Sequence, residues 1–329
     1  SGHWPTVPAN PTQEDARAAL AMLEDVFIDF PWEQPSGRSV AVAALLSILA
    51  RPAVQGAVPA FILDANDSGF GKSLVADTIC TIATGRDPAP VHYPSNQANA
   101  DEEVEKILGG AAMGGAAVLC WDDLDVSNPF GGSAIQSVIT TRDTRSFRIL
   151  GKTGQVVLPW RAITLATGNN VQTTRDMERR VYRARIVAKW PSAAARPLDS
   201  YTHPERKGRL IEYVTEQRQA LVIAALTVLR AYHLAGRPAV PGVIEHEGFE
   251  AWSRLVPSAI AWAGGASLSA HRPVSSSQRS PEQLALETVC AFWGALCETV
   301  APGTGMLQVG GAVKFLYPCL LYTSDAADE

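Results

Sequence analysis

The sequence predicts an α/β fold in which a mainly parallel sheet lies between helices and a smaller, all-helical C-terminal region follows. Short apolar runs at 58–64, 116–124 and 162–168 alternate with segments whose apolar residues recur at helical spacing. Each run ends in a Gly-containing or polar stretch, and beyond about Leu210 only helical spacing remains. Strands that alternate with helices favour a parallel sheet that is covered on both faces.

The first third of the chain surrounds a Gly-rich turn. Pro31, Pro52 and Gly85 each follow a run of helical spacing, and proline and glycine are residues at which helices end. The apolar run VPAFILD predicts a strand directly before the turn. In chain order we expect a Pro-rich linker at 1–13, helices at 14–30 and 37–50, a strand at 58–64 and a helix from about 72 to 84.

The middle of the chain continues the alternation of strands and helices. Asp101 is a residue type that caps helices, and it opens a segment of helical spacing. The expected elements are a short strand at 90–94, a helix at 101–113, a strand at 116–124, a helix at 132–141, a hairpin of strands at 145–150 and 155–160, and a strand at 161–170.

The last part of the chain is expected to be helical. The spacing predicts one long helix over 208–236, a helical stretch over 247–265 that Pro257 kinks, and a last helix over 281–300 after a Ser-rich linker. The final residues match the translation of a sequencing adapter, and an initiating Met is absent, so we expect a piece of a longer protein. The expected domains are a sheet domain at 14–208, a helical lid at 209–265, a linker with a truncated helical segment at 266–318, and a non-native tail at 319–329.

Composition limits the classes of partner. A net charge of −5 and a pI of ≈ 5.7 provide no global basic field, so a contact with nucleic acid has to be local. The apolar runs are too short to cross a bilayer, and we expect a cytoplasmic protein without membrane contact. The five cysteines lack paired spacing, which argues against a disulfide framework and a zinc site, so buried apolar roles are expected for them.

The turn at 64–79 reads DANDSGFGKSLVADTI and predicts a phosphate-binding loop. In such a loop backbone N–H groups surround the phosphates, the Lys72 ammonium reaches the terminal phosphates and the Ser73 hydroxyl holds Mg²⁺, all at a helix N-terminus. Asn66 stands where the usual pattern has its first glycine. We expect Asn66 to adopt the left-handed backbone in place of that glycine, because Asn does so at modest cost.

Two further strands end in polar side chains. The run AAVLCWDDLD places Asp122 as a ligand of Mg²⁺ through water and Asp123 as the group that orients the attacking water, with Asp125 as an alternative. The run AITLATGNN places Asn169 or Asn170 beside the γ-phosphate. Because carboxyl ends of parallel strands meet at one edge of a sheet, these groups are expected beside the loop.

Arginines follow the Asn-tipped strand in the segment TTRDMERRVYRARI. Arg179 and Arg180 are candidates for stabilising charge in the transition state, which is the role of an arginine finger. The alternation of Val181, Arg183, Arg185 and Val187 is typical of a strand, so some of these arginines are expected to be structural.

Taken together, these segments resemble the AAA+ type of P-loop NTPase, and within it superfamily-three helicases and the helicase-like ATPase portion of phage and mobile-element primase-helicase proteins. The resemblance covers roughly residues 5–263. Its most specific segments are NDSGFGKS, VLCWDDLD, FRILGKT and ATGNNVQTTRDMERRVYRARI.

The resemblance implies ATP and Mg²⁺ as ligands. It implies that Ser73 and Asp122 hold the metal ion, that Asp123 and Asn169 act on the attacking water, and that Arg180, rather than Arg179, is the finger acting in trans. Contacts with the nucleotide are implied for the whole loop: Asn66, Asp67, Ser68, Gly69, Phe70, Gly71, Lys72, Ser73 and Leu74. Contact with DNA or with the next subunit is implied for the hairpin residues Arg145, Arg148 and Lys152.

The implied function is an ATP-driven DNA motor in a homo-oligomeric, hexameric ring, as part of a phage or mobile-element replication protein that binds single- or double-stranded DNA. A second hypothesis is a nucleotide-gated binding or scaffold module with little turnover, because Asn66 and Asp123 depart from the family pattern. A third is a P-loop kinase, which the Asn-tipped strand and the paired arginines disfavour.

Overall fold

A computed structural model describes residues 6–94, 100–124, 129–148, 154–187, 189–192 and 194–268. Contacts divide the chain into two compact units, 1–273 and 274–329, and all described residues belong to the first. The predicted segments beyond 268, Asp125 and Lys152 lie outside the described residues. In the part that is described, no helix combines the length and the apolar character that a membrane span requires.

A parallel sheet with the strand order β2-β3-β6-β1-β7 forms the centre of this unit. The order places β6 between β1, which precedes the Gly-rich turn, and the acidic strand β3. The carboxyl ends of β1, β3 and β6 are therefore neighbours at one edge of the sheet. The strands are β1 (Ala60–Ala65), β2 (Val91–His92), β3 (Val118–Leu124), β6 (Ile163–Asn169) and β7 (Val181–Ile186).

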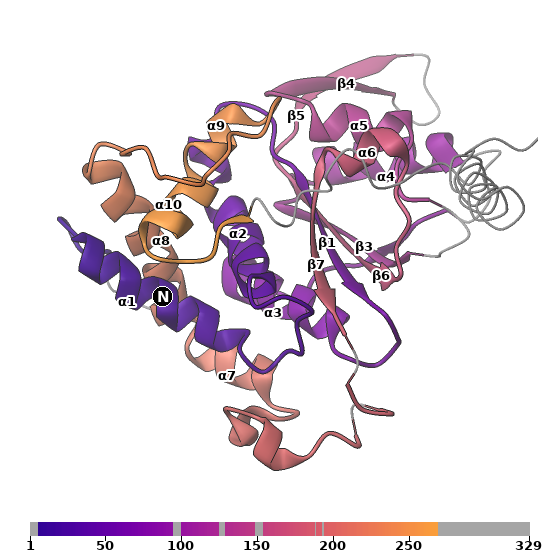
Figure 1. Cartoon of the computed structure of the whole chain (residues 1–329). Helices are drawn as coiled ribbons and strands as arrows, with labels where there is room; N and C mark the ends of the chain where they lie inside the picture. The colour runs from indigo at the N-terminus through magenta and orange to yellow at the C-terminus, as the bar shows by residue number, and fades with distance from the viewer. Residues whose placement is uncertain are drawn as a thin grey trace, which may run out of the picture. The chain divides into compact units, whose positions relative to one another are not determined.

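Helices cover both faces of this sheet, as Figure 1 shows for α2 and α3 on one side and α4 and α5 on the other. The predicted α/β class with a helical C-terminal region is confirmed. The predicted hairpin is confirmed as the antiparallel pair β4 (Thr144–Arg148) and β5 (Gln155–Pro159), and it packs against α4. The helices in this half are α1 (Gln13–Val26), α2 (Gly37–Ala50), the 3₁₀ turn η1 (Arg51–Ala53), α3 (Lys72–Thr84), α4 (Ala100–Met113), α5 (Ser133–Ile139) and α6 (Arg175–Glu178).

The first helix is shorter than predicted. A capping box opens it, in which the backbone N–H of Asp15 donates to the Thr12 hydroxyl and the Asp15 carboxylate accepts from the Thr12 N–H. It ends at Val26 rather than at Pro31, and the segment that follows pairs with the end of β7: Glu33 N donates to the Arg185 carbonyl at 2.8 Å. This pairing holds the loop between α1 and α2 beside the Gly-rich turn.

The prediction of one long helix over 208–236 is wrong. The segment forms α7 (Leu210–Glu216) and α8 (Arg218–Leu234), with a break at Gln217. Arg218, at the start of α8, donates to the carbonyl oxygens of Thr81, Ile82 and Ala83 at the end of α3. The break lets α7 pack on α3 while α8 packs on α1.

The other C-terminal elements are the 3₁₀ turns η2 (Leu198–Ser200) and η3 (Pro204–Arg206) and the helices α9 (Glu250–Ser253) and α10 (Val256–Trp262). The helical stretch predicted over 247–265 is divided into α9 and α10, and α10 begins one residue before Pro257, the residue at which a kink was expected. These helices share one buried core with the sheet, in which Trp252 packs against Phe61 and Tyr182. Cys80 and Cys120 are buried and free, as expected, and burial raises the pKa of the Cys80 thiol to about 12.

Candidate functional site

The candidate site lies at the carboxyl edge of the sheet, where the strand register brings the predicted residues together. Asn169 of β6 lies opposite Ala65, the last residue of β1. Thr167 of β6 is hydrogen-bonded to Asp122 of β3. Adjacent strands lie about 4.8 Å apart, so the loop after β1 and the acidic end of β3 are separated by about 10 Å.

The Gly-rich loop depends on Gly69 and Gly71, the two glycines of the segment 64–73. Gly69 has φ 79° and Gly71 has φ 97°, both in the region that side chains rarely adopt. A Cβ on Gly71 would also lie 3.0 Å from the Phe30 ring. Gly71 is the N-cap of α3, so this backbone turns the following N–H groups toward the loop.

The expectation of a left-handed backbone at Asn66 is wrong. Among the described non-glycine residues only Asp123, Asn170 and Arg237 have positive φ. Asn66 instead extends the strand pairing, because its N–H donates to the Ile186 carbonyl at 3.3 Å and its own carbonyl accepts from the Asn170 side chain at 3.3 Å. The position therefore has no conformational need for glycine.

Lys72 occupies the first position of α3 and is 9% exposed. No carboxylate of the described residues lies within salt-bridge distance of its ammonium group. Because most of the Lys72 side chain is removed from water, its ammonium group is stabilised by an anion or by hydrogen-bond acceptors. The first N–H groups of α3 lack intrahelical acceptors and the helix dipole favours negative charge there, so the site fits a phosphate ligand.

The remaining loop residues surround Lys72. Asp67 and Ser68 are exposed, and the Asp67 carboxylate accepts from the Ser68 N–H at 2.7 Å. Phe70 is buried, Leu74 is half-buried and Ser73 is exposed on the first turn of α3. Ser73 and Asp122 supply oxygen atoms of the type that Mg²⁺ prefers. The described residues contain no group of three or more His, Cys, Asp or Glu side chains that could hold a metal ion by themselves, so a cation there would also need phosphate or water ligands.

The acidic end of β3 is held by a residue that sequence reasoning missed. The Thr167 hydroxyl donates to Asp122 Oδ1 at 2.5 Å and accepts from the Asp123 N–H at 3.3 Å. Asp123 has φ 53°, and the pairing of β3 with β6 shifts register between Trp121 and Leu124. The Asp123 side chain is exposed as a result. The signal for Thr167 in the sequence was its place two residues before Asn169 on the same strand.

The two candidate sensor residues differ in their partners. Asn170 has φ 49°, and its side chain is engaged by Arg185 Nη2 at 2.6 Å and by the Asn66 carbonyl. Asn169 Oδ1 is buried and has no hydrogen-bond partner among the described residues. A buried amide oxygen without a partner is costly, so Asn169 is the residue with unused hydrogen-bonding capacity at this edge.

Arg179 and Arg180 lie at the opposite edge of the sheet. The Arg180 carbonyl accepts from the N–H of Ala60, which starts β1, whereas the loop follows Ala65 about 17 Å further along the strand. Arg180 donates to Gln136 Oε1 at 2.9 Å, and partial burial together with the charge of Arg179 lowers its pKa. Arg179 is exposed and forms a weak ion pair with Asp176 at 3.6 Å.

Arg183 and Arg185 are structural, as the alternation indicated. Both contact Asp64 Oδ2, at 3.3 and 2.5 Å, and the Asp64 side chain is fully buried. Asp64 Oδ1 accepts from the Val171 N–H at 3.1 Å. This cluster ties the end of β1, the turn after β6 and β7 together, and so it holds the base of the Gly-rich loop.

The hairpin residues have different surroundings. Arg145 donates to Glu105 of α4 at 2.7 Å and lies over the Phe147 ring. Arg148 is exposed at the end of β4. Of Arg145, Arg148 and Lys152, Lys152 lies outside the described residues and Arg145 is half-buried, so Arg148 is the exposed cation that the structure describes.

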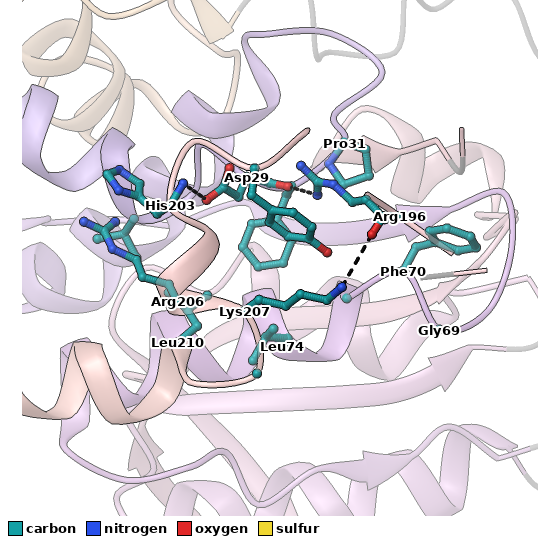
Figure 2. A pocket seen from close by; sticks show the side chains of 15 residues that line it. Asp29, Pro31, Gly69, Phe70, Leu74, Arg196, His203, Arg206, Lys207 and Leu210 are labelled. Atoms are coloured by element: carbon teal, nitrogen blue, oxygen red, sulfur yellow. Dashed lines mark hydrogen bonds between the residues drawn. The ribbon is translucent and has the colours of Figure 1, made fainter. Parts of the chain in front are cut away.

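A pocket lies beside the loop, between the segment after α1 and the segment 196–210 (Figure 2). Figure 2 shows Arg196 on the Phe70 side of the pocket, and the Lys207 ammonium donates to the Arg196 carbonyl at 3.4 Å. Arg196 lies over the Tyr201 ring, 3.6 Å from its centroid, and donates to the Asp29 carbonyl. The lining is largely aromatic and aliphatic, which suits the flat, apolar faces of a nucleobase. The lining residues are Val26, Asp29, Phe30, Pro31, Gly69, Phe70, Gly71, Leu74, Arg196, Tyr201, His203, Arg206, Lys207, Gly208 and Leu210.

Two carboxylates anchor the segment 196–210 over the pocket. Asp29 accepts from the backbone N–H groups of Thr202 at 2.6 Å and His203 at 3.0 Å. Asp25 contacts His203 Nε2 at 2.7 Å and accepts from Arg206 at 2.8 Å. Sequence reasoning missed this wall of the pocket, because its contacts join positions more than 160 residues apart.

Comparisons with known proteins assign the chain to no family. No protein-family model matches it, and no curated protein matches it at a significant level. Similar solved structures include an apo form of the NrS-1 C-terminal region, with 13% identity and a TM-score of 0.40, over 68% of this chain and 47% of that one. The JCV helicase has 12% identity and a TM-score of 0.30, over 74% of this chain and 67% of that one. The chain therefore spans about half the length of the NrS-1 structure.

Proposed function

We propose that this chain is an ATP-binding and hydrolysing motor domain, a DNA helicase-like ATPase that works as a homo-oligomeric, hexameric ring in a phage or mobile-element replication protein. The observation that carries the proposal is that three groups meet at one edge of the sheet: the buried Lys72 at the start of α3 after β1, the carboxylate Asp122 of β3 and the amide Asn169 of β6. Hydrolysis of a nucleotide phosphate requires an anion site, an acidic group and a polar group that positions water, and these three kinds of group lie on neighbouring elements here.

In this proposal each residue has one task. Lys72 and the first N–H groups of α3 bind the terminal phosphates, and the pocket at Phe30 and Tyr201 binds the nucleobase. Ser73 and Asp122 would hold Mg²⁺, which when bound would neutralise charge on the phosphate oxygens. Asp123 and Asn169 orient a water molecule for attack.

The positions of Arg179 and Arg180 support a ring. Both lie about 17 Å or more from the loop of their own chain, since the length of β1 separates the two edges of the sheet. An arginine at the amino edge reaches a nucleotide only if that nucleotide is bound to another copy. A closed ring supplies that neighbour for every subunit.

Nucleotide hydrolysis is tested with Lys72→Ala, and the control is Lys106→Ala, which removes an exposed ammonium group from α4. We expect Lys72→Ala to weaken ATP binding by about 10- to 100-fold, because a charged hydrogen bond contributes about 1.5–3 kcal/mol. Lys106→Ala should stay within about twofold of the wild type. Equal behaviour of the two variants, in steady-state ATPase and nucleotide-binding assays, would remove the assigned site.

The motor hypothesis makes three further predictions for the same protein. Single-stranded DNA should stimulate ATPase activity, and light scattering should detect a nucleotide-dependent oligomer. Mixing Lys72→Ala chains with Arg179→Ala/Arg180→Ala chains should restore part of the lost activity, because about a quarter of interfaces in a random equal mixture combine an intact loop with intact arginines. A strictly monomeric protein without DNA stimulation contradicts the motor.

A nucleotide-gated scaffold with little turnover is the second candidate. The register shift at Asp123, together with its short side chain, favours this function because the group that orients water would be poorly placed. If Lys72→Ala abolishes ATP binding while Asp123→Asn leaves an already negligible turnover unchanged, the scaffold function holds and the motor does not.

A further inference from the structure

We propose that Thr167 is a positioning residue for ATP hydrolysis, whose hydroxyl group orients both members of the acidic pair. The inference rests on the proposed function, and it adds a residue to which the sequence motifs give no role. Thr167 is fully buried on β6, between the strand of the Gly-rich loop and the acidic strand. It does not line the pocket, and among the described residues its hydroxyl bonds only Asp122 and Asp123, so we infer that it acts through these two residues.

The hydrogen bonds of Thr167 use the hydroxyl group in both directions. Its hydrogen is donated to Asp122 Oδ1 at 2.5 Å, and one of its lone pairs accepts from the Asp123 N–H at 3.3 Å. A hydroxyl carries one donor and two acceptor sites, so both bonds can form at once. The bond to the carboxylate fixes which oxygen of Asp122 faces the sheet and leaves Oδ2 without a hydrogen-bond donor among the described residues.

The bond to the Asp123 N–H stabilises an unfavourable backbone. Asp123 has φ 53° and interrupts the pairing of β3 with β6, so its N–H is not satisfied by the regular ladder. Non-glycine residues persist in this region when their surroundings hold them there. The Thr167 hydroxyl replaces the missing ladder partner, and the Asp123 side chain is thereby directed out of the sheet at its carboxyl edge.

The residue after Thr167 allows the same arrangement. A Cβ on Gly168 would lie 2.8 Å from the Leu124 carbonyl oxygen and 2.6 Å from Val171. Only glycine lets β3 approach β6 this closely beyond the irregularity. Thr167, Gly168 and Asn169 therefore form a continuous segment in which the first residue orients the acidic pair, the second admits the backbone of β3 and the third presents its amide.

The orientation of Asp122 matters most where a cation is bound. A carboxylate with one oxygen already committed presents the other in a fixed direction, which lowers the cost of ordering a metal ligand. Loss of the hydroxyl should therefore weaken the binding of Mg²⁺ and slow hydrolysis, while the binding of nucleotide without Mg²⁺ stays unchanged. A purely structural threonine would not produce this separation.

The test compares Thr167→Val, which has the same shape but lacks the hydroxyl, with Thr167→Ser, which keeps it. For Thr167→Val we expect kcat to fall about tenfold or more and the half-saturating Mg²⁺ concentration to rise severalfold, with metal-free ATP affinity within about twofold. Thr167→Ser should recover kcat to within about threefold of the wild type. Thr164→Val serves as the control, because Thr164 is a buried threonine of the same strand that lies opposite Leu119, away from the acidic pair.

The outcomes separate this inference from the proposed function. If the wild type hydrolyses ATP and Thr167→Val has the same kcat and the same Mg²⁺ dependence, the role of Thr167 is overturned while the proposed ATPase function stands. If the wild type binds ATP without turnover, the role of Thr167 is tested by the Mg²⁺ dependence of ATP affinity in the wild type and in Thr167→Val. Equal Mg²⁺ dependence in the two proteins overturns that role. If Thr167→Val unfolds, Thr167→Ser and Thr167→Ala are compared by the same two readouts, and equal Mg²⁺ dependence in these two variants again overturns the proposal.

Discussion

Replacing Asp64 by Asn should destabilise the protein more than the loss of any exposed charge, because Asp64 holds the base of the Gly-rich loop. Its carboxylate is fully buried and contacts Arg183 and Arg185 at 3.3 and 2.5 Å. Asn has nearly the same shape and keeps an acceptor for the Val171 N–H, which Asp64 bonds at 3.1 Å. The substitution removes the negative charge, and it also replaces the acceptor Oδ2, which faces Arg183 and Arg185, by an NH₂ donor.

The expected magnitude follows from the burial of the three charges. Removing one partner of a buried ion pair costs about 3–5 kcal/mol, because the opposite charge is left uncompensated. The two arginine side chains are 23% and 27% exposed, so solvent compensates part of their charge. We therefore expect a loss of about 3 kcal/mol in the free energy of unfolding, which corresponds to a fall in Tm of about 6–12 °C for a domain of this size.

The measurement is the unfolding midpoint in urea and by heat for Asp64→Asn beside Glu33→Gln. Glu33 provides a matched control, because it also contacts Arg185, at 3.7 Å, but its side chain is 51% exposed. Glu33→Gln should cost less than about 0.5 kcal/mol. If both variants lose the same stability, or if Asp64→Asn unfolds at the wild-type midpoint, the argument from burial is refuted.

Two further predictions concern the anchors of the pocket wall and of α3. Burial alone would raise the pKa of Asp25, but hydrogen bonds from His203 and Arg206 outweigh it and hold that pKa below its ordinary value. Asp25→Asn should therefore lower the free energy of unfolding at pH 7, as measured by urea titration. The difference in free energy between the variant and the wild type should shrink as pH falls below about 4, because the wild type then loses the same charge. A difference in free energy that is constant with pH contradicts this. Arg218→Ala should lower the free energy of unfolding by about 2 kcal/mol, because it removes hydrogen bonds to three carbonyls of α3. The loss for Arg218→Lys should be intermediate. Equal unfolding midpoints for Arg218→Ala and the wild type contradict this prediction.

Most of the fold was predictable from local patterns. The strands of the sheet and the helix at 72–84 were expected from short apolar runs, prolines and glycines, and the structure confirms them. The two failures involve partners that are distant in sequence. Helical spacing continues through Gln217, but Arg218 breaks the helix by binding the end of α3, and α1 stops at Val26 because the next segment pairs with β7.

The candidate site shows the same limit for single residues. Asn66 looked like a substitute for a left-handed glycine, yet its backbone is held in ordinary pairing by Ile186 and Asn170. Motif spacing could not rank Asn169 against Asn170. The difference between them is that Arg185 engages Asn170, while the amide oxygen of Asn169 is buried without a partner.

By itself the sequence determined which strands end in chemically useful groups, since periodicity and motif chemistry act over a few neighbouring residues. It could not determine that β6 lies between β1 and β3, that Thr167 thereby meets Asp122, or that Tyr201 and Arg196 close a pocket beside the loop. Those contacts depend on the order of strands and on the path of long connections. The free energy that selects that order comes from the burial of the whole core and the pairing of its charges, which no short segment contains.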